Sequence, residues 1–199
     1  MVLSDRDIKK ALKSGRIKIT PIPNLTETLG PCSIDFHLGS TFKLFQHTKH
    51  AYIDVKNLHN SENMMEEIKV GKDEPFVLRP GELVLSTTEE SLELGDDILG
   101  RIEGRSSLGR LGVVVHSTAA RVDPGWVGKP AMELGNIGVM PVALYPGMKI
   151  CSLTFEYLSS PVEVMYKNKP GAKYAGEAGP VASKIGEEFP GGKGYKGRK

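Results

Sequence analysis

The sequence predicts an all-β protein, a distorted barrel or jelly roll preceded by one helix. Short apolar or alternating runs of strand length recur along most of the 199 residues. Proline and glycine separate these runs at short intervals, which is typical of strands joined by turns. Only the N-terminal segment has a helical pattern. No internal repeat or linker is visible, so a single domain over residues 1–199 is expected.

The predicted helix begins after Ser4, a natural N-cap that is followed by acidic residues in the first turn. An apolar stripe with helical spacing continues the pattern: Ile8, Ala11 and Leu12. The pattern stops near Ser14 and Gly15, where the helix is expected to end.

The later runs are predicted to be strands, at residues 17–19, 34–38, 41–45, 76–78, 83–86, 98–102, 111–115, 142–144 and 149–156. The polar segment 47–73 has weak periodicity around residues 64–68, which indicates an insertion with a short helix. From residue 167 onward glycine, lysine and proline dominate, a composition that cannot build a core. Residues 167–199 are therefore predicted to form a C-terminal tail.

The composition is ordinary for a compact globular enzyme, with 39% hydrophobic and 25% charged residues. A net charge of +2 is too small to imply binding to nucleic acid. No apolar run approaches the roughly 18 residues that span a bilayer, and the N-terminus is not signal-like. A cytoplasmic protein without a membrane partner is expected. Cys32 and Cys151 form no metal pattern and are expected to be reduced, mostly buried thiols.

The run GRSSLGR at residues 104–110, named here the Arg-Ser turn, combines small residues with arginines and serines. Small residues let backbone N–H groups approach an anion, and guanidinium groups bind phosphate oxygens in bidentate pairs. A phosphate-binding turn is one interpretation of this run, and a plain solvated hairpin turn is the other.

A second candidate region follows the apolar run at residues 111–115, where the chain becomes polar and turns at Asp123, Pro124 and Gly125. Glu133 then stands among apolar neighbours. One interpretation is an outward-pointing glutamate on an alternating strand. The other is a half-buried general base with a raised pKa.

Several motifs occur along the chain: LSDRDI at 3–8, GPCSID at 30–35, LRPGE at 78–82, the core at 104–133, PGM at 146–148 and AKY at 172–174. In this order and spacing they resemble the dCTP deaminase and dUTPase superfamily over nearly the full length. Glu133, at its distance from the Arg-Ser turn, is similar to the deaminase branch. The resemblance implies a distorted jelly roll of the dUTPase-like type, a closed homotrimer and active sites between subunits.

The activity that the resemblance implies is hydrolytic deamination of dCTP to dUTP and ammonia, in pyrimidine deoxynucleotide biosynthesis leading to dUMP and dTTP. Zinc is not expected, because the chain has no C-x-x-C motif and its histidines lack metal-ligand spacing. Without a metal, a carboxylate must move the protons. Mg²⁺ is expected only as a companion of the triphosphate, held mostly by phosphate and water.

The resemblance gives Glu133 the role of general acid and base. Ser106 and Arg110 would hold the attacking water or the Glu133 carboxylate in place. The other residues of the Arg-Ser turn would complete the triphosphate site: Arg105, Ser107, Leu108 and Gly109.

Around the sugar, the resemblance implies that Asp123 accepts a hydrogen bond from the deoxyribose 3′-hydroxyl. Trp126 would lie near the sugar and disfavour ribose, or else be a core aromatic residue. Backbone groups of Ala131 and Met132 would contact the pyrimidine edge, as the edge of a sheet binds an added strand. His116 is expected to be a supporting residue rather than a catalyst.

Near the C-terminus, Tyr166, Lys173 and Glu177 correspond to positions that form a lid over the phosphates in the deaminases. Glu177 departs from the family pattern, which has glutamine there, and a carboxylate would repel a triphosphate unless it meets Mg²⁺ or points away. Lys184 and the basic residues 193–199 are expected to be solvated charges.

Three alternatives remain open from the sequence. Bifunctional family members also cleave dUTP to dUMP and diphosphate, and they carry glycine and an aromatic residue where this chain has Ala120 and Arg121. The long cationic side chain of Arg121 resembles the monofunctional pattern. A plain dUTPase would ignore cytosine nucleotides, and a binding module without activity would merely hold an anion with the Arg-Ser turn.

Overall fold

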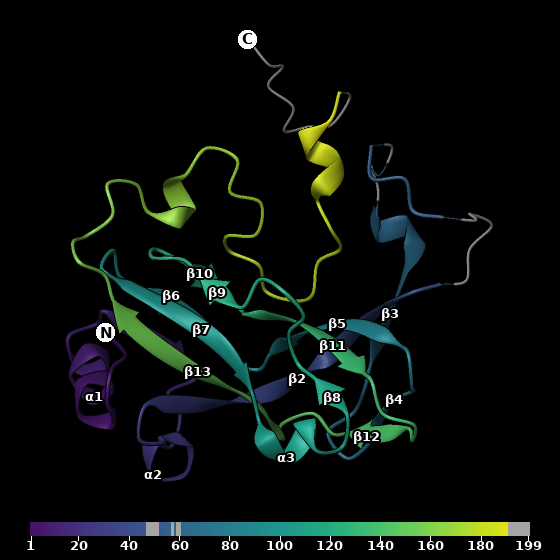
Figure 1. Ribbon diagram of the computed structural model, residues 1–199, viewed down its shortest axis with the longest axis horizontal. Coiled ribbons are helices and arrows are strands. Elements are labelled where there is room, and N and C mark those ends of the chain that lie inside the picture. Colours follow the sequence, from purple (N-terminus) through teal and green to yellow (C-terminus); the bar gives the residue numbers. More distant parts are fainter. Residues whose placement is uncertain (47–51, 57, 59–60, 191–199) are drawn as a thin grey trace.

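The computed structural model describes residues 1–46, 52–56, 58 and 61–190 (Figure 1). Strands dominate the chain, which confirms the predicted all-β class with an N-terminal helix, α1 (Asp5–Lys13). The remaining helical elements are single turns: α2 (Leu25–Thr28), η1 (Ser61–Met64), α3 (Ser106–Gly109), η2 (Tyr166–Asn168) and η3 (Ile185–Glu188).

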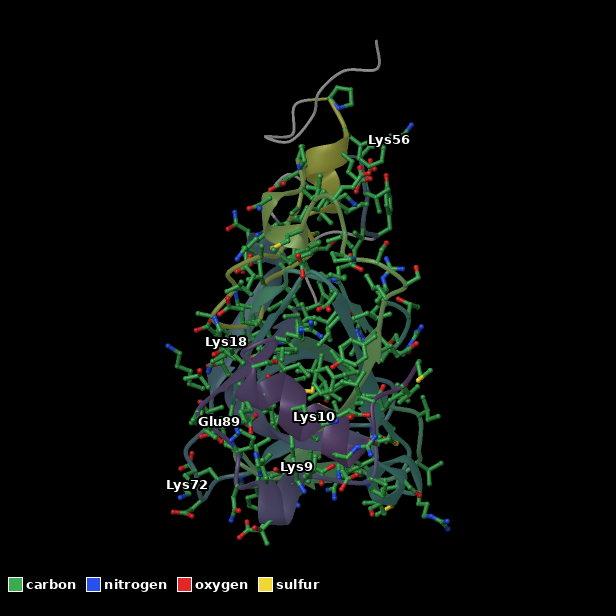
Figure 2. The ribbon with its side chains drawn as sticks, turned by 90° about the vertical axis from the view of Figure 1, so that its left-hand side faces the viewer. Lys9, Lys10, Lys18, Lys56, Lys72 and Glu89 are labelled. Atoms are coloured by element: carbon green, nitrogen blue, oxygen red, sulfur yellow. The ribbon has the colours of Figure 1, made fainter. Side chains whose placement is uncertain are left out.

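Helix α1 has the limits that its sequence predicts. Ser4 stands at the N-cap position, although its hydroxyl donates to the Asp7 carboxylate over 3.4 Å and caps no backbone group. Ile8, on the inner face of the helix, is fully buried. Lys9 and Lys10 lie on the solvent side, where Figure 2 labels them. The helix therefore covers one part of the core with its apolar face.

One curved sheet contains most of the strand residues, in the order β8-β11-β5-β2-β13-β7-β9, and β3 also pairs with β2 (Figure 1). Its strands are β2 (Ser33–Phe45), β3 (Met65–Lys69), β5 (Leu83–Thr88), β7 (Ile98–Gly104), β8 (Val113–Val114), β9 (Arg121–Val122), β11 (Ala131–Asn136) and β13 (Lys149–Tyr157). A second sheet has the order β1-β6-β10 and a third pairs β12 with β4. Their bounds are β1 (Ile17–Thr20), β4 (Phe76–Leu78), β6 (Ser91–Leu94), β10 (Val127–Gly128) and β12 (Val142–Leu144).

The core fills the space enclosed by these sheets and by α1. Phe36, Phe42 and Phe155 are completely buried. Phe42 stacks on Phe76 with ring centroids 4.2 Å apart, so it links the main sheet to β4. Aromatic stacking of this kind adds to the free energy gained from area burial alone.

Strand β2 joins the two halves of the main sheet. Its first residues pair with β13 and its last with β5, and the register shifts between Leu38 and Phe42. Gly39 lies at this shift, where a Cβ atom would come within 2.8 Å of the Thr87 carbonyl oxygen. The separate strands predicted at 34–38 and 41–45 are therefore one bent strand, because a bulge at glycine bends a strand without ending it.

Two other predicted elements were wrong in part. Residues 65–69 form β3 instead of the predicted helix, because pairing with β2, with Ile68 opposite Phe42, overrides a weak helical periodicity. The strand predicted at 111–115 is reduced to β8, because Gly112 has a φ of +86°, which breaks the extended backbone. Residues 47–51, 57 and 59–60 of the predicted insertion lie outside the described residues, as do residues 191–199.

The two cysteines differ in exposure. Both are free thiols, but Cys151 is buried and Cys32 is exposed. Burial raises the pKa of the Cys151 thiol. The expectation of two mostly buried thiols is thus wrong for Cys32, which lies in the loop before β2.

Candidate functional site

A cavity of about 920 Å³ opens between β11, the loop that follows β8, and the C-terminal segment (residues 158–190). Part of its lining is apolar, from Phe45, Leu83, Leu85, Ile102 and Val122. Charged side chains of both signs complete it: Arg101, Arg121, Asp123, Lys129, Glu133 and Glu177. Apolar walls with a few convergent polar groups are typical of a small-molecule site.

Glu133 faces this cavity because of the alternation along β11. Met132 and Leu134 are fully buried in the core, so the side chain between them points to the opposite face of the sheet. Its Oε2 atom lies 2.6 Å from Nδ1 of His116 and accepts a hydrogen bond from the Ser117 N–H over 3.2 Å. Both partners come from the loop after β8. The carboxylate is thus held from one side by two nitrogen atoms.

These contacts set the acidity of Glu133. The hydrogen bond from His116 lowers the pKa of Glu133 below its usual value of 4.5, and this outweighs the upward effect of burial. The positive charge that His116 can carry and the Ser117 N–H act in the same direction. The predicted raised pKa is therefore wrong. Glu133 is half-buried, but its partners favour the carboxylate over the acid.

Trp126 and Tyr166 form an aromatic wall of the cavity, with ring centroids 5.4 Å apart. Trp126 also packs against the hydrophobic core, so its two predicted roles do not exclude one another. Asp123 lines the cavity as well, and its carboxylate accepts a hydrogen bond of 2.6 Å from the Arg121 guanidinium. Aromatic and carboxylate side chains thus both contribute to the cavity lining.

Ala131 and Met132 contribute differently. Ala131 is exposed and lines the cavity, whereas the Met132 side chain is fully buried, so only the backbone of Met132 is available to a ligand. β5 pairs along the whole of this stretch, but β8 pairs only with Gly135 and Asn136. The second edge of β11 is therefore open to the cavity at these residues.

The C-terminal segment closes the cavity through backbone contacts. The Gly176 N–H donates to the Val127 carbonyl oxygen over 2.7 Å, and the Lys129 N–H donates to that of Glu177 over 2.8 Å. Gly128 lies between them with a φ of +130°, and a Cβ atom there would come within 2.8 Å of the Glu177 carbonyl oxygen. Only glycine permits this close approach.

Lys184 neutralises Glu177. Its ammonium lies 2.5 Å from the Glu177 carboxylate and donates to the Lys173 carbonyl oxygen over 2.6 Å. The Lys184 N–H donates to the Tyr174 hydroxyl, so Lys184 is not the freely solvated charge predicted. The predicted phosphate ligand Lys173 pairs with Glu188 and lies outside the cavity lining.

The Arg-Ser turn lies apart from this cavity. Residues 106–109 form α3, at the lower edge of Figure 1, whereas the C-terminal segment lies at the upper edge. None of residues 105–110 lines the cavity. Within one chain, the structure does not bring Ser106 or Arg110 to Glu133.

The side chains of the Arg-Ser turn are held locally. One Arg105 nitrogen donates to the Lys149 carbonyl oxygen over 3.1 Å, and another lies 3.5 Å from the Asp35 carboxylate. The Arg110 guanidinium donates to the Ser106 hydroxyl over 3.5 Å. Leu108 anchors the turn by its burial, whereas most of its other residues face solvent: Ser106, Ser107, Gly109 and Arg110.

An exposed apolar patch adjoins this turn. It comprises Leu111, Ile137, Val139 and Met140, each more than half exposed. The Ile137 N–H donates to the Gly112 carbonyl oxygen over 2.8 Å, which joins the two loops that carry the patch. Apolar side chains grouped on a surface indicate contact with another protein surface.

Among the described residues, no group of three His, Cys, Asp or Glu side chains is placed to hold a metal ion. Within the same residues, no helix has the length and apolar character needed to cross a membrane.

The family of the chain follows from comparison with known proteins. A sequence model described as dCTP deaminase-like matches residues 2–158. The chain belongs to this dCTP deaminase-like family. The match includes the Arg-Ser turn, Asp123 and Glu133, so the predicted resemblance is confirmed.

Relatives match over almost their whole length. A dCTP deaminase of Thermomicrobium roseum is 56% identical over 95% of this chain and 96% of its own. A "dCTP deaminase, dUMP-forming" of Dictyoglomus thermophilum is 49% identical, over 95% of this chain and 97% of its own. The crystal structure of a 2′-deoxycytidine 5′-triphosphate deaminase from Agrobacterium tumefaciens has the same fold, with a TM-score of 0.61 and 19% identity over 79% of this chain and 48% of that one.

Sequence reasoning missed two parts of the cavity. Tyr174 lines it, although the family motif at residues 172–174 pointed to its neighbour Lys173. His116 contacts Glu133 directly, which no local pattern indicates, because the two residues are 17 positions apart in the sequence and only the fold brings them together.

Proposed function

We propose that this chain deaminates dCTP hydrolytically to dUTP and ammonia, in pyrimidine deoxynucleotide biosynthesis. The observation that carries the proposal is the Glu133 carboxylate, which faces a nucleotide-sized cavity in a chain of the dCTP deaminase-like family. The names of similar proteins support deamination of dCTP.

In the proposed mechanism Glu133 moves the protons. The carboxylate takes a proton from water, the resulting hydroxide adds to C4 of the cytosine, and the proton passes to ring N3. The tetrahedral centre then collapses: the C4 hydroxyl gives its proton to Glu133, which passes it to the amino nitrogen. The bond from C4 to that nitrogen breaks, and ammonia leaves behind a C4 carbonyl group. General acid–base transfer of this kind contributes roughly 10²–10⁴-fold. The lowered pKa of Glu133 supports the role of base, because the group is ionised at neutral pH.

The cavity walls suggest how the nucleotide lies. Asp123 would accept from the 3′-hydroxyl of the deoxyribose, and Trp126 would pack beside the sugar. The open edge of β11 at Ala131 and Met132 would pair with the pyrimidine edge through backbone groups. Tyr166 and Glu177 would close the phosphate end, and Lys173 would join them on exchanging Glu188 for phosphate.

The Arg-Ser turn enters the proposed site from a second subunit. Ser106 and Arg110 lie outside the cavity of their own chain, and the exposed apolar patch lies beside them. We therefore propose a closed homotrimer in which the turn of one subunit faces Glu133 of the next. Arg105, Ser107, Leu108 and Gly109 would then complete the triphosphate site across that interface.

The proposed reaction uses no zinc. The donor set fits neither a zinc centre nor a dedicated magnesium cage, because no three suitable side chains among the described residues converge. Mg²⁺ would be bound by the triphosphate itself and would neutralise its charge. The chain's own residues then bind the base and sugar and move the protons.

The product is proposed to be dUTP. Arg121 fills the position beside Asp123 with a long cationic side chain and pairs with its carboxylate, which leaves that group less free to activate a water molecule. A second candidate function, cleavage of dUTP to dUMP and diphosphate in the same site, is favoured by relatives at 49% and 48% identity whose names say "dUMP-forming".

The test is to incubate the purified, chelator-treated protein with dCTP and Mg²⁺, to separate nucleotides by anion exchange and to assay ammonia. We expect dUTP and ammonia in equal amounts. dUMP with diphosphate would establish the second function instead. Cleavage of added dUTP without turnover of dCTP would overturn the deaminase proposal.

A further inference from the structure

We infer that His116 is the positioning residue of Glu133, and that it assigns different tasks to the two carboxylate oxygens. This inference rests on the proposed function, in which Glu133 moves the protons of the reaction. The geometry points to Oε2 as the anchored oxygen and to Oε1 as the oxygen that exchanges protons with water and substrate.

The first observation is the contact itself. His116 Nδ1 lies 2.6 Å from Glu133 Oε2, a short distance for a bond between nitrogen and oxygen. The Ser117 N–H binds the same oxygen from the next residue along the chain. Two donors on Oε2 fix the plane of the carboxylate. No hydrogen bond to Oε1 occurs within the described residues, so this oxygen is available to a ligand.

The second observation is burial. The His116 side chain is 8% exposed, whereas that of Glu133 is 34% exposed. The imidazole is therefore the fixed partner and the carboxylate is the partner that solvent or substrate can reach. A buried ring with a single strong partner has little freedom to rotate, so it can hold a neighbouring group in a defined orientation.

The third observation concerns the other ionisable groups around the pair. The cavity also contains Arg101, Arg121, Lys129, Asp123 and Glu177, with the phenols Tyr166 and Tyr174. Arg101 pairs with Glu156, Arg121 with Asp123, and Glu177 with Lys184. Among the described residues, none of these groups shares a hydrogen bond or ion pair with His116 or Glu133. Among the described residues, His116 is thus the ionisable side chain that contacts Glu133 directly.

The consequence is that His116 sets the pKa and the orientation of the Glu133 carboxylate. His116 Nδ1 donates to the carboxylate and favours its ionised form, which lowers the pKa of Glu133 and keeps the base ready at neutral pH. On protonation through Oε1, the acid retains its alignment because Oε2 stays bound. Removal of the donor therefore raises the pKa of Glu133 and frees the carboxylate to rotate.

The experiment separates the bond from the packing. His116→Phe keeps a ring of similar shape without Nδ1, whereas His116→Asn restores a nitrogen donor near the same position. As a matched control, His37→Phe breaks the other histidine–carboxylate contact, the 2.5 Å pair with buried Glu90, which lies outside the cavity. The readouts are kcat, KM and the pH dependence of kcat/KM for dCTP, together with ¹³C NMR titration of the Glu133 carboxyl group in the free protein.

We expect kcat of His116→Phe to fall between about 10- and 100-fold, since a displacement of about 1 Å can cost roughly 10²-fold. The KM should change little. The acidic limb of the pH profile and the NMR titration of Glu133 should both move to higher pH, and His116→Asn should recover part of each change. His37→Phe should alter neither the profile nor the Glu133 titration.

A folded His116→Phe protein with an unchanged kcat and an unchanged acidic limb would overturn the inference. If His116→Phe does not fold, the NMR titration of His116→Asn decides, because a neutral amide is a weaker donor than imidazole: the titration of Glu133 should still move part of the way to higher pH. An unchanged Glu133 titration and an unchanged kcat in His116→Asn would then overturn the inference. Failure of the proposed function has a different signature: the unaltered chain itself would release no ammonia from dCTP.

Discussion

Glu133 takes its orientation and its acidity from different parts of the chain. Alternation along β11 buries Met132 and Leu134 and turns the carboxylate to the cavity. The loop after β8 then supplies His116 and the Ser117 N–H, which lower its pKa. A carboxylate that is ionised at neutral pH and held through one oxygen follows from these two contributions.

Replacement of Glu133 by glutamine tests its proposed role. Glu133→Gln keeps the size of the side chain and removes the basic oxygen, so kcat for dCTP should fall by about 10²–10⁴-fold. Binding of dCTP, measured by calorimetry, should change little. Glu89→Gln is the matched control, because Glu89 is exposed and lies outside the cavity (Figure 2). Turnover by Glu133→Gln equal to that of the control would contradict the mechanism.

The same pair makes stability depend on pH. The pKa of Glu133 in the folded chain lies below its usual value of 4.5, so the carboxylate stabilises the fold above pH 4.5. This contribution is lost as the pH falls from there through the folded-state pKa. Urea unfolding of the unaltered chain and of Glu133→Gln should therefore differ most near pH 7 and converge in acid. A difference independent of pH would show that His116 does not stabilise the ionised form.

At the residue scale, the sequence predicted several of the residues that line the cavity. Glu133, Asp123, Tyr166 and Glu177 all line the cavity. It did not predict the direction of the Glu133 pKa shift, because burial and a hydrogen bond act in opposite directions. Which of them prevails depends on the position of His116, and that position is set by the fold.

At the scale of elements, hydrogen bonds join the C-terminal segment to the insertion before β3. The Glu62 carboxylate accepts from the Ala182 N–H over 2.9 Å and pairs with Lys43 at 2.6 Å. The Ser61 hydroxyl donates to the Ser183 carbonyl oxygen over 2.6 Å. Both views place the insertion and η3 at the same end of the molecule, where Figure 2 labels Lys56 (Figures 1 and 2). The insertion thus supports the segment that closes the cavity.

Loss of this support should loosen the cavity wall without unfolding the sheet. Burial acts to raise the pKa of Glu62, but Lys43 and the Ala182 N–H bring it below its usual value, so the group is charged at neutral pH. Glu62→Ala removes both contacts. Since one hydrogen bond contributes about 1 kcal/mol, trypsin should cleave the C-terminal segment several-fold faster.

Glu67→Ala is the matched control for that experiment. Glu67 also pairs with Lys43, at 3.7 Å, and shares no hydrogen bond or ion pair with the described part of the C-terminal segment. The expected result is an unchanged cleavage rate in the control. Equal acceleration in both variants would mean that the charge of Lys43, rather than the Glu62 contact, governs the wall.

The elements themselves were predicted where apolar patterns were strong and bounded. Helix α1 and strands such as β4, β12 and β13 appear at their expected places. The errors arose where tertiary contacts decide. β3 is a strand because β2 pairs with it, and the run at 111–115 is interrupted because Gly112 adopts a positive φ. The sequence did not predict that residues after 158 form a wall of the cavity, because this segment contains few of the apolar residues that build a core.

At the scale of the whole molecule, the separation of Glu133 from the Arg-Ser turn makes subunit exchange the decisive test. Glu133→Gln and Arg110→Ala should each be inactive as a pure protein. In a proposed trimer with sites between neighbours, random mixed assembly should restore roughly a quarter of the sites. The measurement is dCTP turnover after the two variants are co-expressed or reassembled, with the assembly state followed by sedimentation.

Mixtures without recovered activity would mean that both residues act within one chain or that the turn has no part in the reaction. The unaltered chain mixed with Glu133→Gln serves as the control, because it should lose activity only by dilution of intact sites. Val139→Asp offers an independent check, since a charge within the exposed apolar patch should shift the sedimentation toward monomers.

The position of the cavity wall at the end of the chain has a consequence for biosynthesis. All strands of the described residues end by Tyr157, whereas Tyr166, Tyr174 and Glu177 are added afterwards. Synthesis proceeds from the N-terminus, and domains fold as they emerge. The sheets can therefore form on the ribosome before the C-terminal residues that line the cavity have been added. A nascent chain, or one cleaved in the C-terminal segment, would then be folded but unable to retain its ligand. Protein quality control that recognises exposed hydrophobic core residues would not detect such a chain.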